Sequence, residues 1–508
     1  KTSALCQIIH FHRSFAQQQG FGMLNPVTIH KIVKVIGDNA IESNNKVYIG
    51  KNSTLELAEA KVRVITPDNK IIELDKSNIK ESEGNDEIGA HYYFAIDGIE
   101  KGSDIEIFYT VLRMPVYDGK RVTIQNESVK KNVTFSLITP ENLEFKFKSY
   151  NNFPEVKLDS TRTGKNFYLA KVDSMGKMMD DEKYSAYDRN VAGVAYKLQK
   201  NTTNGKNNII SFNNISQDIY KAYHYELDKA NQKALKKFIA DAKIADLTNP
   251  DDIILALENY AKQNISIIKG VPTKTIAFTL KDKYTSPKGM TVLLMRAYES
   301  LDIKTELVLT CDRYEDEFSE EFEHYGLLEN MILYFPTSNK YLAPTEYGYR
   351  YGLIPSEWTN QKGLFIKSIG AGDLVTGVGK VKFIEPTKSS ISQDNMNVNV
   401  VFDDINEPTF TFKRELTGHS SIFMQTVYSI IDDKIKKEFE EGYIKFADKT
   451  GEITEYKVTG TEIADINKNP LVFSGTMSSK SSVEKAGNKY IFKVGDLIGP
   501  QTEMYKDS

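Results

Sequence analysis

Cysteine and histidine, the residues that form a thiol nucleophile and its base, are rare in this chain of 508 amino acids. Two cysteines, Cys6 and Cys311, and seven histidines are present. Cys311 and His324 stand on either side of an acidic segment, and together they could supply the thiolate and the base of an acyl transferase or a peptidase. A lone thiol is more often a small buried apolar residue, so both interpretations of Cys311 stay open.

Other kinds of site have little support in the sequence. His91, His224 and His419 have no histidine four residues away and no thiol cluster, so we expect no metal site. The acidic run at 314–324 lacks the twelve-residue calcium loop with its glycine, and it is typical of a solvated loop. The glycines at 370–372 are not followed by the rest of a phosphate-binding motif. We therefore expect no cofactor.

The elements that would position a site change in character along the chain. Between about 45 and 211, apolar and polar residues mostly alternate, and turn residues at 67–70 separate two strands of a predicted hairpin at 61–65 and 71–74. This pattern predicts an antiparallel β-sandwich over 27–219, preceded by an N-terminal tail at 1–26.

The middle region, 220–370, has signals for helices and then strands. Asn249-Pro250 and Ser286-Pro287 each place a capping residue before a proline, which is typical of a helix start. Three apolar segments follow as predicted strands, 306–310, 330–335 and 340–342. We expect an α+β core here and a β-domain at 371–508, which makes the fold class multidomain α+β.

The middle region also carries a family resemblance. The segment 274–309 resembles bacterial transglutaminase-like proteins, in which a helix beginning at a cysteine carries a Leu-Leu pair and leads to a Gly-Ile strand entry; Leu293-Leu294 and Asp302-Ile303 stand at these positions. The sequence LENMIL at 328–333 is similar to the strand of the family that contains its histidine. YLAPT at 341–345 is similar to the strand Tyr-Leu-Asp-Pro-Thr, and a Gly-x-x-Pro turn follows at 352–355. The resemblance implies a papain-like α+β core.

The flanking regions support the same resemblance. Residues 27–215 resemble a β-sandwich of unknown function that precedes such cores in Gram-negative envelope proteins, and 371–505 resemble the β-domain that follows them. The resemblance implies a periplasmic, cell-surface or secreted protein. Ser14-Phe15-Ala16 has the small-x-small pattern of a signal-peptidase site, although histidines interrupt the region before it.

The resemblance also shows which catalytic groups this sequence lacks. It places the cysteine of the family at Pro287, the histidine at Asn330 and the aspartate at Ala343. Pro287 has no nucleophile, Asn330 does not take up a proton at neutral pH, and Ala343 cannot accept a hydrogen bond from an imidazole. Ser286 precedes Pro287 and is better explained as a helix cap than as a nucleophile.

Composition limits the partners. Lys and Arg total 65 against 69 for Asp and Glu, a net charge of 65 − 69 = −4, which argues against nucleic acid as the main partner. No apolar run reaches the roughly 18 residues of a membrane-spanning helix. We therefore predict a non-catalytic, transglutaminase-like envelope protein that binds a protein, a peptide or a glycan or acts as a scaffold. The alternative is an enzyme that uses Cys311 and His324.

Overall fold

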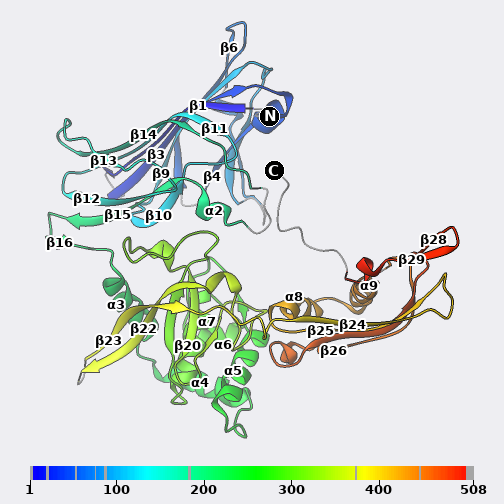
Figure 1. The fold of residues 1–508 in the computed structure, drawn as a ribbon. Coiled ribbons are helices and arrows are strands. Elements are labelled where there is room, and N and C mark those ends of the chain that lie inside the picture. Colours follow the sequence, from blue (N-terminus) through cyan, green and yellow to red (C-terminus); the bar gives the residue numbers. More distant parts are fainter. Residues whose placement is uncertain are drawn as a thin grey trace. The chain divides into compact units, whose positions relative to one another are not determined.

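The computed structural model describes residues 4–18, 22–51, 54–74, 76–84, 89–180, 185–371, 374–445 and 448–498 (Figure 1). The chain divides into two compact units. The N-terminal unit comprises Lys1–Ile215 together with Tyr314–Leu327, and the C-terminal unit comprises Ser216–Arg313 together with Leu328–Ser508. Both are rich in β-sheet, and the helices concentrate in the second, so the protein is a multidomain α+β protein.

The N-terminal unit is built around a nine-stranded sheet. Its strands follow the order β13-β14-β11-β1-β3-β9-β5-β6, and β2 pairs with β3. Their bounds are β1 (Ala4–Ser14), β2 (Ala16–Gln18), β3 (Gly22–Val35), β5 (Thr54–Ile65), β6 (Ile71–Glu73), β9 (Asp104–Arg113), β11 (Val129–Thr139), β13 (Lys157–Leu158) and β14 (Asn166–Met175). The predicted hairpin is confirmed, because β5 pairs with β6 in the register Arg63 to Glu73.

Two expectations for this region are wrong. Residues 1–26 are not simply a tail, because β1 pairs along its length with β3 and β11 and so lies inside the sheet. The sheet is also not wholly antiparallel, since β1 and β11 run parallel, with Leu5 opposite Val129. Two parallel neighbours require a long connection, and here more than a hundred residues separate them, which local patterns do not reveal.

Two smaller sheets pack on this large sheet and enclose its core. Phe135, Phe145 and Tyr196 belong to one apolar cluster, and Val47 and Ile105 to another. The strands are β10 (Asp118–Thr123), β12 (Leu143–Tyr150), β15 (Gly193–Asn201) and β16 (Lys206–Asn207) in one small sheet, and β4 (Lys46–Gly50), β7 (Lys80–Ser82) and β8 (His91–Ala95) in the other. The short helices of this unit are α1 (Asp38–Asn44) and α2 (Tyr187–Asn190).

The acidic segment Tyr314–Leu327 belongs to the N-terminal unit, and it is not the solvated loop that its charges suggest. Phe322 and His324 are buried, and the ring of Phe318 stacks on Phe212 with 5.4 Å between centroids. Lys197 Nζ donates to the carbonyl of Glu323 at 2.7 Å. Aromatic burial and backbone hydrogen bonds to lysines therefore hold a segment whose acidic side chains alone would favour solvent.

The C-terminal unit begins with helices and continues into a five-stranded sheet of order β21-β20-β19-β22-β23. The helix starts at Asn249 and Ser286 are confirmed, since each side chain caps the helix that follows it. The helices are α3 (Phe212–Tyr223), which crosses the unit boundary, α4 (Lys229–Asp241), α5 (Pro250–Asn264), α6 (Ile276–Asp282) and α7 (Pro287–Glu299). The short strands β17 (Ser266–Ile267) and β18 (Tyr284–Thr285) pair with each other.

The three strands predicted for this core have the expected bounds, and two more complete the sheet. These strands are β19 (Glu306–Thr310), β20 (Asn330–Phe335), β21 (Lys340–Leu342), β22 (Gln361–Ala371) and β23 (Leu374–Ile384). The expected boundary at 370 is wrong, because it falls inside the hairpin of β22 and β23, which belong to one sheet.

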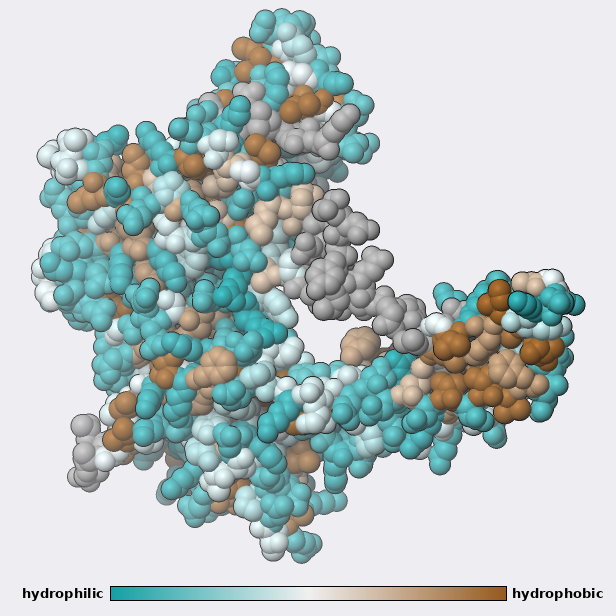
Figure 2. All heavy atoms as spheres, viewed as in Figure 1, coloured by the Kyte–Doolittle hydropathy of each residue, from teal (hydrophilic) through white to brown (hydrophobic). Residues whose placement is uncertain are grey.

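The last region combines a four-stranded sheet with two helices, so it is not purely a β-domain. Helices α8 (His419–Tyr428) and α9 (Asp433–Ile444) share an apolar cluster with the sheet, in which Tyr428 and Ile444 pack with Phe412 and Phe473. Exposed apolar side chains also gather in this region (Figure 2). The strands are β24 (Asp394–Val401), β25 (Thr409–Leu416), β26 (Glu452–Thr459) and β27 (Leu471–Ser478), with a separate hairpin of β28 (Val483–Ala486) and β29 (Lys489–Phe492).

Candidate functional site

The first turn of α7 contains the position that the resemblance assigns to the nucleophile. Pro287 is the first residue of the helix, and Ser286 Oγ accepts a hydrogen bond from the backbone N–H of Gly289 at 3.2 Å. Thr273 Oγ1 lies 2.7 Å from the same Ser286 oxygen. Ser286 is therefore a buried helix cap with both local partners in place, and Pro287 suits the first turn because that position needs no N–H donor.

Asn330, at the start of β20, occupies the position of the histidine. With its amide oriented to satisfy its neighbours, Asn330 Oδ1 accepts from the indole Nε1–H of Trp358 at 3.1 Å and from the backbone N–H of Asp312 at 3.3 Å. The side chain thus accepts hydrogen bonds from two N–H donors. This is a structural role, because an amide in this arrangement accepts hydrogen bonds and transfers no proton.

Ala343 directly follows β21 and occupies the position of the aspartate. Its side chain is fully buried in an apolar cluster, and its neighbours there are Val308, Ile332, Ile354, Trp358, Phe365 and Ile384. An ionised carboxylate in this apolar cluster would lose its hydration, which is costly. The surroundings of Ala343 therefore fit the apolar residue that is present.

The elements around these three positions lie next to one another. Thr291, on the first turns of α7, has its Oγ1 3.7 Å from the sulfur of Met331 on β20, and the Tyr223 hydroxyl donates to the same sulfur at 3.0 Å. Trp358 connects the other two positions, since it bonds to Asn330 and packs in the cluster of Ala343. The correspondence of these positions to a catalytic triad stays a prediction.

A buried ion pair beside Ala343 was not predicted from the sequence. Glu258 and Lys262 lie one turn apart on α5, with side chains 0% and 1% exposed, and Lys262 Nζ is 2.7 Å from Glu258 Oε1. The same ammonium group donates to three backbone carbonyls, those of Ala343 at 2.8 Å, Glu346 at 2.7 Å and Tyr349 at 2.8 Å. Lys262 therefore fixes the turn that follows β21.

Glu258 and Arg350 extend this network to the backbone at 347–351. Glu258 Oε2 accepts from the backbone N–H of Tyr351, and the buried Arg350 donates to the carbonyls of Tyr347 and Tyr349. Burial lowers the pKa of Lys262 to about 8, although the Glu258 carboxylate opposes this shift. In the sequence, Glu and Lys four residues apart are typical of an exposed helix pair, so no local signal indicates that this pair is buried.

Cys311 and His324 have different surroundings. Cys311 is buried after β19, where its Sγ donates to Gln361 Oε1 at 3.5 Å. His324 is 1% exposed, and neither ring nitrogen has a hydrogen-bond partner among the described residues. Burial, together with the positive charges of Lys148 and Lys197, lowers the pKa of His324 to about 3. A neutral imidazole of such low pKa is a poor acceptor for the proton of a thiol.

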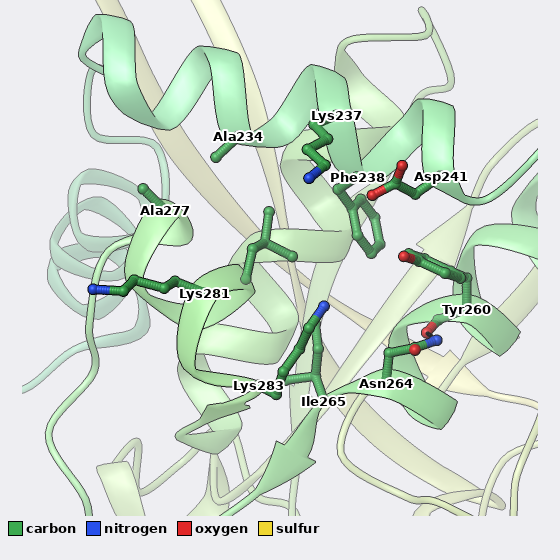
Figure 3. A pocket seen from close by; sticks show the side chains of 11 residues that line it. Ala234, Lys237, Phe238, Asp241, Tyr260, Asn264, Ile265, Ala277, Lys281 and Lys283 are labelled. Atoms are coloured by element: carbon green, nitrogen blue, oxygen red, sulfur yellow. Dashed lines mark hydrogen bonds between the residues drawn. The ribbon is translucent and has the colours of Figure 1, made fainter.

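Two cavities among the described residues lie away from these positions. One, of about 320 Å³, is formed by α4, α5 and α6 (Figure 3). A wider groove of about 610 Å³ follows β5 and β9 around His30, Arg63 and Glu106. Neither is lined by Pro287 or Asn330, and the described residues contain no group of three metal-ligating side chains. No helix among the described residues is both long and apolar enough to cross a membrane.

Comparison with known proteins supports part of the resemblance. Residues 26–174 match a domain of unknown function with a solved structure, DUF3857. This match confirms that the N-terminal region contains a domain of unknown function. A comparison with curated proteins finds no match. A crystal structure described as a "putative protease" from Parabacteroides distasonis is 12% identical, with a TM-score of 0.55, and the alignment covers 97% of this chain and 95% of that chain. This likeness shows a common fold over almost the whole chain.

Two further solved structures are similar only in part. One is described as a "putative nutrient binding protein" from Legionella pneumophila, with 10% identity, a TM-score of 0.22, and coverage of 53% of this chain and 83% of that chain. The other is described as a TGase, with 10% identity, a TM-score of 0.19, and coverage of 42% and 51%. Scores this low support no inference about the activity of this chain.

Proposed function

We propose that this chain is a non-catalytic, transglutaminase-like protein of the bacterial envelope, periplasmic or on the cell surface, that binds a protein, peptide or glycan or acts as a scaffold. One observation carries the proposal. The three positions at which the family places cysteine, histidine and aspartate hold Pro287, Asn330 and Ala343, and each of these residues has a structural role instead.

The physical argument concerns what acyl transfer requires. A thiolate mechanism needs a nucleophile beside a base, and a third group that orients the base. Here the helix start carries a proline, the strand carries an amide that serves Trp358, and the next position lies in an apolar cluster. A fold can persist after its site is lost, and function is argued from the site.

The surroundings of Cys311 and His324 do not favour the alternative enzyme. The thiol hydrogen of Cys311 is directed to an amide oxygen of Gln361, and the low pKa of His324 disfavours its acting as a base near neutral pH. Cys311 is also 2% exposed, whereas a reactive thiol needs access to its substrate.

Thiol chemistry tests the proposal. The purified chain would be treated with iodoacetamide at pH 6 and pH 8, and it would be incubated with a glutamine-containing peptide and a primary amine while mass spectrometry follows amide cleavage and transfer. We expect slow alkylation of Cys311 and no turnover. Rapid alkylation at pH 6 that is lost in a His324→Asn variant, or turnover that is lost in Cys311→Ser, would overturn the proposal.

A further inference from the structure

The cavity formed by α4, α5 and α6 combines an apolar floor with charged walls. Phe238 of α4 and Ile265, which follows α5, are buried, at 1% and 4% exposure, and Leu280 of α6 lines the cavity beside them. The volume of about 320 Å³ lies at the lower end of the range of about 300 to 1,000 Å³ typical of small-molecule sites. The floor suits one aliphatic side chain rather than a large ring system.

Two lysine ammonium groups face this floor. Figure 3 shows the side chains of Lys237, from α4, and Lys283, which follows α6, directed into the cavity, and Lys281 lines its edge. Lys237 and Lys283 form no ion pair among the described residues. Their charges remain available to an anion, and a hydrogen bond between ammonium and carboxylate is stronger than one between neutral groups.

The backbone at Lys283 adds a second observation. Lys283 is the C-terminal cap of α6 and has φ 61°, in the left-handed region where glycine or asparagine is usual. A lysine in this conformation costs about 1 kcal/mol relative to glycine. The same conformation directs its side chain toward the cavity (Figure 3), so the sequence keeps an ammonium group at a place where local stability favours another residue.

Hydrogen-bond acceptors line the cavity beside Lys237 (Figure 3). Asp241, at the end of α4, and Tyr260, on α5, line the cavity, and Figure 3 shows the carboxylate and the phenol on the same side. Burial and the Asp241 carboxylate raise the pKa of Tyr260, so its hydroxyl stays protonated near neutral pH. A ligand that fits this cavity therefore has an anionic group, an apolar group and an N–H donor.

We propose that this cavity binds the C-terminal residue of a short peptide. The peptide carboxylate lies between Lys237 and Lys283, an aliphatic terminal side chain packs on Phe238 and Leu280, and the N–H of that residue donates toward Asp241. A free phosphate fits less well, because it has no apolar group for the floor and the Asp241 carboxylate repels a second negative charge. This inference rests on the proposed non-catalytic function, because it assumes that the peptide is bound and is not cleaved.

Calorimetric titration of the whole chain with two probes tests the inference. The first probe is acetyl-alanyl-leucine, which has a free carboxylate, and the second is its C-terminal amide. We expect the acid to bind and the amide to bind at least about ten-fold more weakly, since a charge-assisted hydrogen bond is lost. Equal affinity for the two probes, or no binding of the acid, would overturn the inference.

Three variants locate the site. Lys237→Gln and Lys283→Asn each remove one ammonium group, and the asparagine also tolerates the left-handed backbone. Each should weaken binding of the acid by about ten-fold or more. Lys236→Gln, on α4 beside Lys237 but not among the residues that line the cavity, is the matched control and should leave the affinity unchanged. Unchanged affinity in both test variants, or an equal loss in the control, would place the binding elsewhere and overturn the inference.

Two further measurements keep the outcomes distinct. Inorganic phosphate that competes as well as the acid probe would show a simple anion site and overturn the peptide assignment. Mass spectrometry of the acid probe after incubation tests the other premise. Cleavage of the probe would refute the proposed non-catalytic function, even if the lysine variants had located its binding correctly. If the probe is not cleaved but the lysine variants bind it as well as the unchanged protein does, only the proposed binding site is refuted.

Discussion

The surroundings of Ala343 and the cavity of α4, α5 and α6 both belong to the C-terminal unit, and both contain lysines beside apolar side chains. They differ in how the polar groups are used. Lys262 Nζ binds the Glu258 carboxylate and three backbone carbonyls, and Asn330 serves two N–H donors. Lys237 and Lys283 have no ion-pair partner among the described residues.

This difference predicts which substitutions change the stability of the fold and which change ligand binding. A polar group whose hydrogen bonds are all made within the protein holds its neighbours in place and has little capacity left for a ligand. A charged group at the wall of a cavity without a protein partner keeps that capacity. Substitutions near Ala343 should therefore change the free energy of unfolding, whereas substitutions in the cavity should change affinity and leave folding nearly unaltered.

The largest effect is expected at Lys262. Lys262→Met removes the partner of a fully buried carboxylate and the donor to three carbonyls, so the free energy of unfolding should fall by about 3 to 5 kcal/mol. Urea denaturation, monitored by circular dichroism, measures this change in the free energy of unfolding. The double variant Glu258→Gln with Lys262→Met should recover part of the loss, because the carboxylate that lost its lysine partner is then replaced by a neutral amide. A loss below about 1 kcal/mol in the single variant would show that the pair is not desolvated.

A smaller loss is expected at Asn330. Asn330→Ala leaves the Trp358 indole N–H and the Asp312 backbone N–H without their acceptor, which should lower the free energy of unfolding by about 2 to 3 kcal/mol. In a Trp358→Phe background the same substitution should cost less, since one of the two donors is absent. Equal costs in both backgrounds would contradict the bond to the indole.

His324 provides an intermediate case, a buried polar group whose ring nitrogens have no hydrogen-bond partner among the described residues. Its pKa is about 3 in the folded chain and about 6.5 when unfolded, so between these values the unfolded state binds more protons and stability falls as pH falls. From pH 7 to pH 5 this residue alone should cost about 2 kcal/mol. His324→Leu should remove that part of the acid sensitivity, as measured by urea denaturation at both pH values. An unchanged pH dependence would refute the neutral, buried imidazole.

The smallest change in stability is expected at Lys283. Lys283→Asn replaces lysine at φ 61° with a residue that tolerates this conformation, so stability should stay equal or rise by up to about 1 kcal/mol. The melting temperature, measured in the absence of peptide, tests this, with Lys281→Gln as the neutral reference. A clear loss of stability would show that Lys283 supports the fold, and the contrast between the two regions would then fail.

Local rules in the sequence determined much of the central core. The capping residues Asn249 and Ser286 fixed two helix starts, and the segments at 306–310, 330–335 and 340–342 became strands with those bounds. The assignment of the cysteine, histidine and aspartate positions to Pro287, Asn330 and Ala343 rests on the resemblance and stays a prediction. Caps, prolines and alternation act within a few residues, so they can be read without knowing what packs on them.

Tertiary structure alone decided the rest. Lys262 binds the carbonyl of Ala343, 81 positions away, and this contact turns an ordinary helix pair into a buried network. Strand β1 pairs in parallel with β11, and the acidic segment Tyr314–Leu327 packs in the N-terminal unit. The cavity forms only where three helices meet. The burial of a charged group and the meeting of helices at a cavity depend on residues that are distant in sequence. Local sequence patterns do not indicate which of these residues will come into contact.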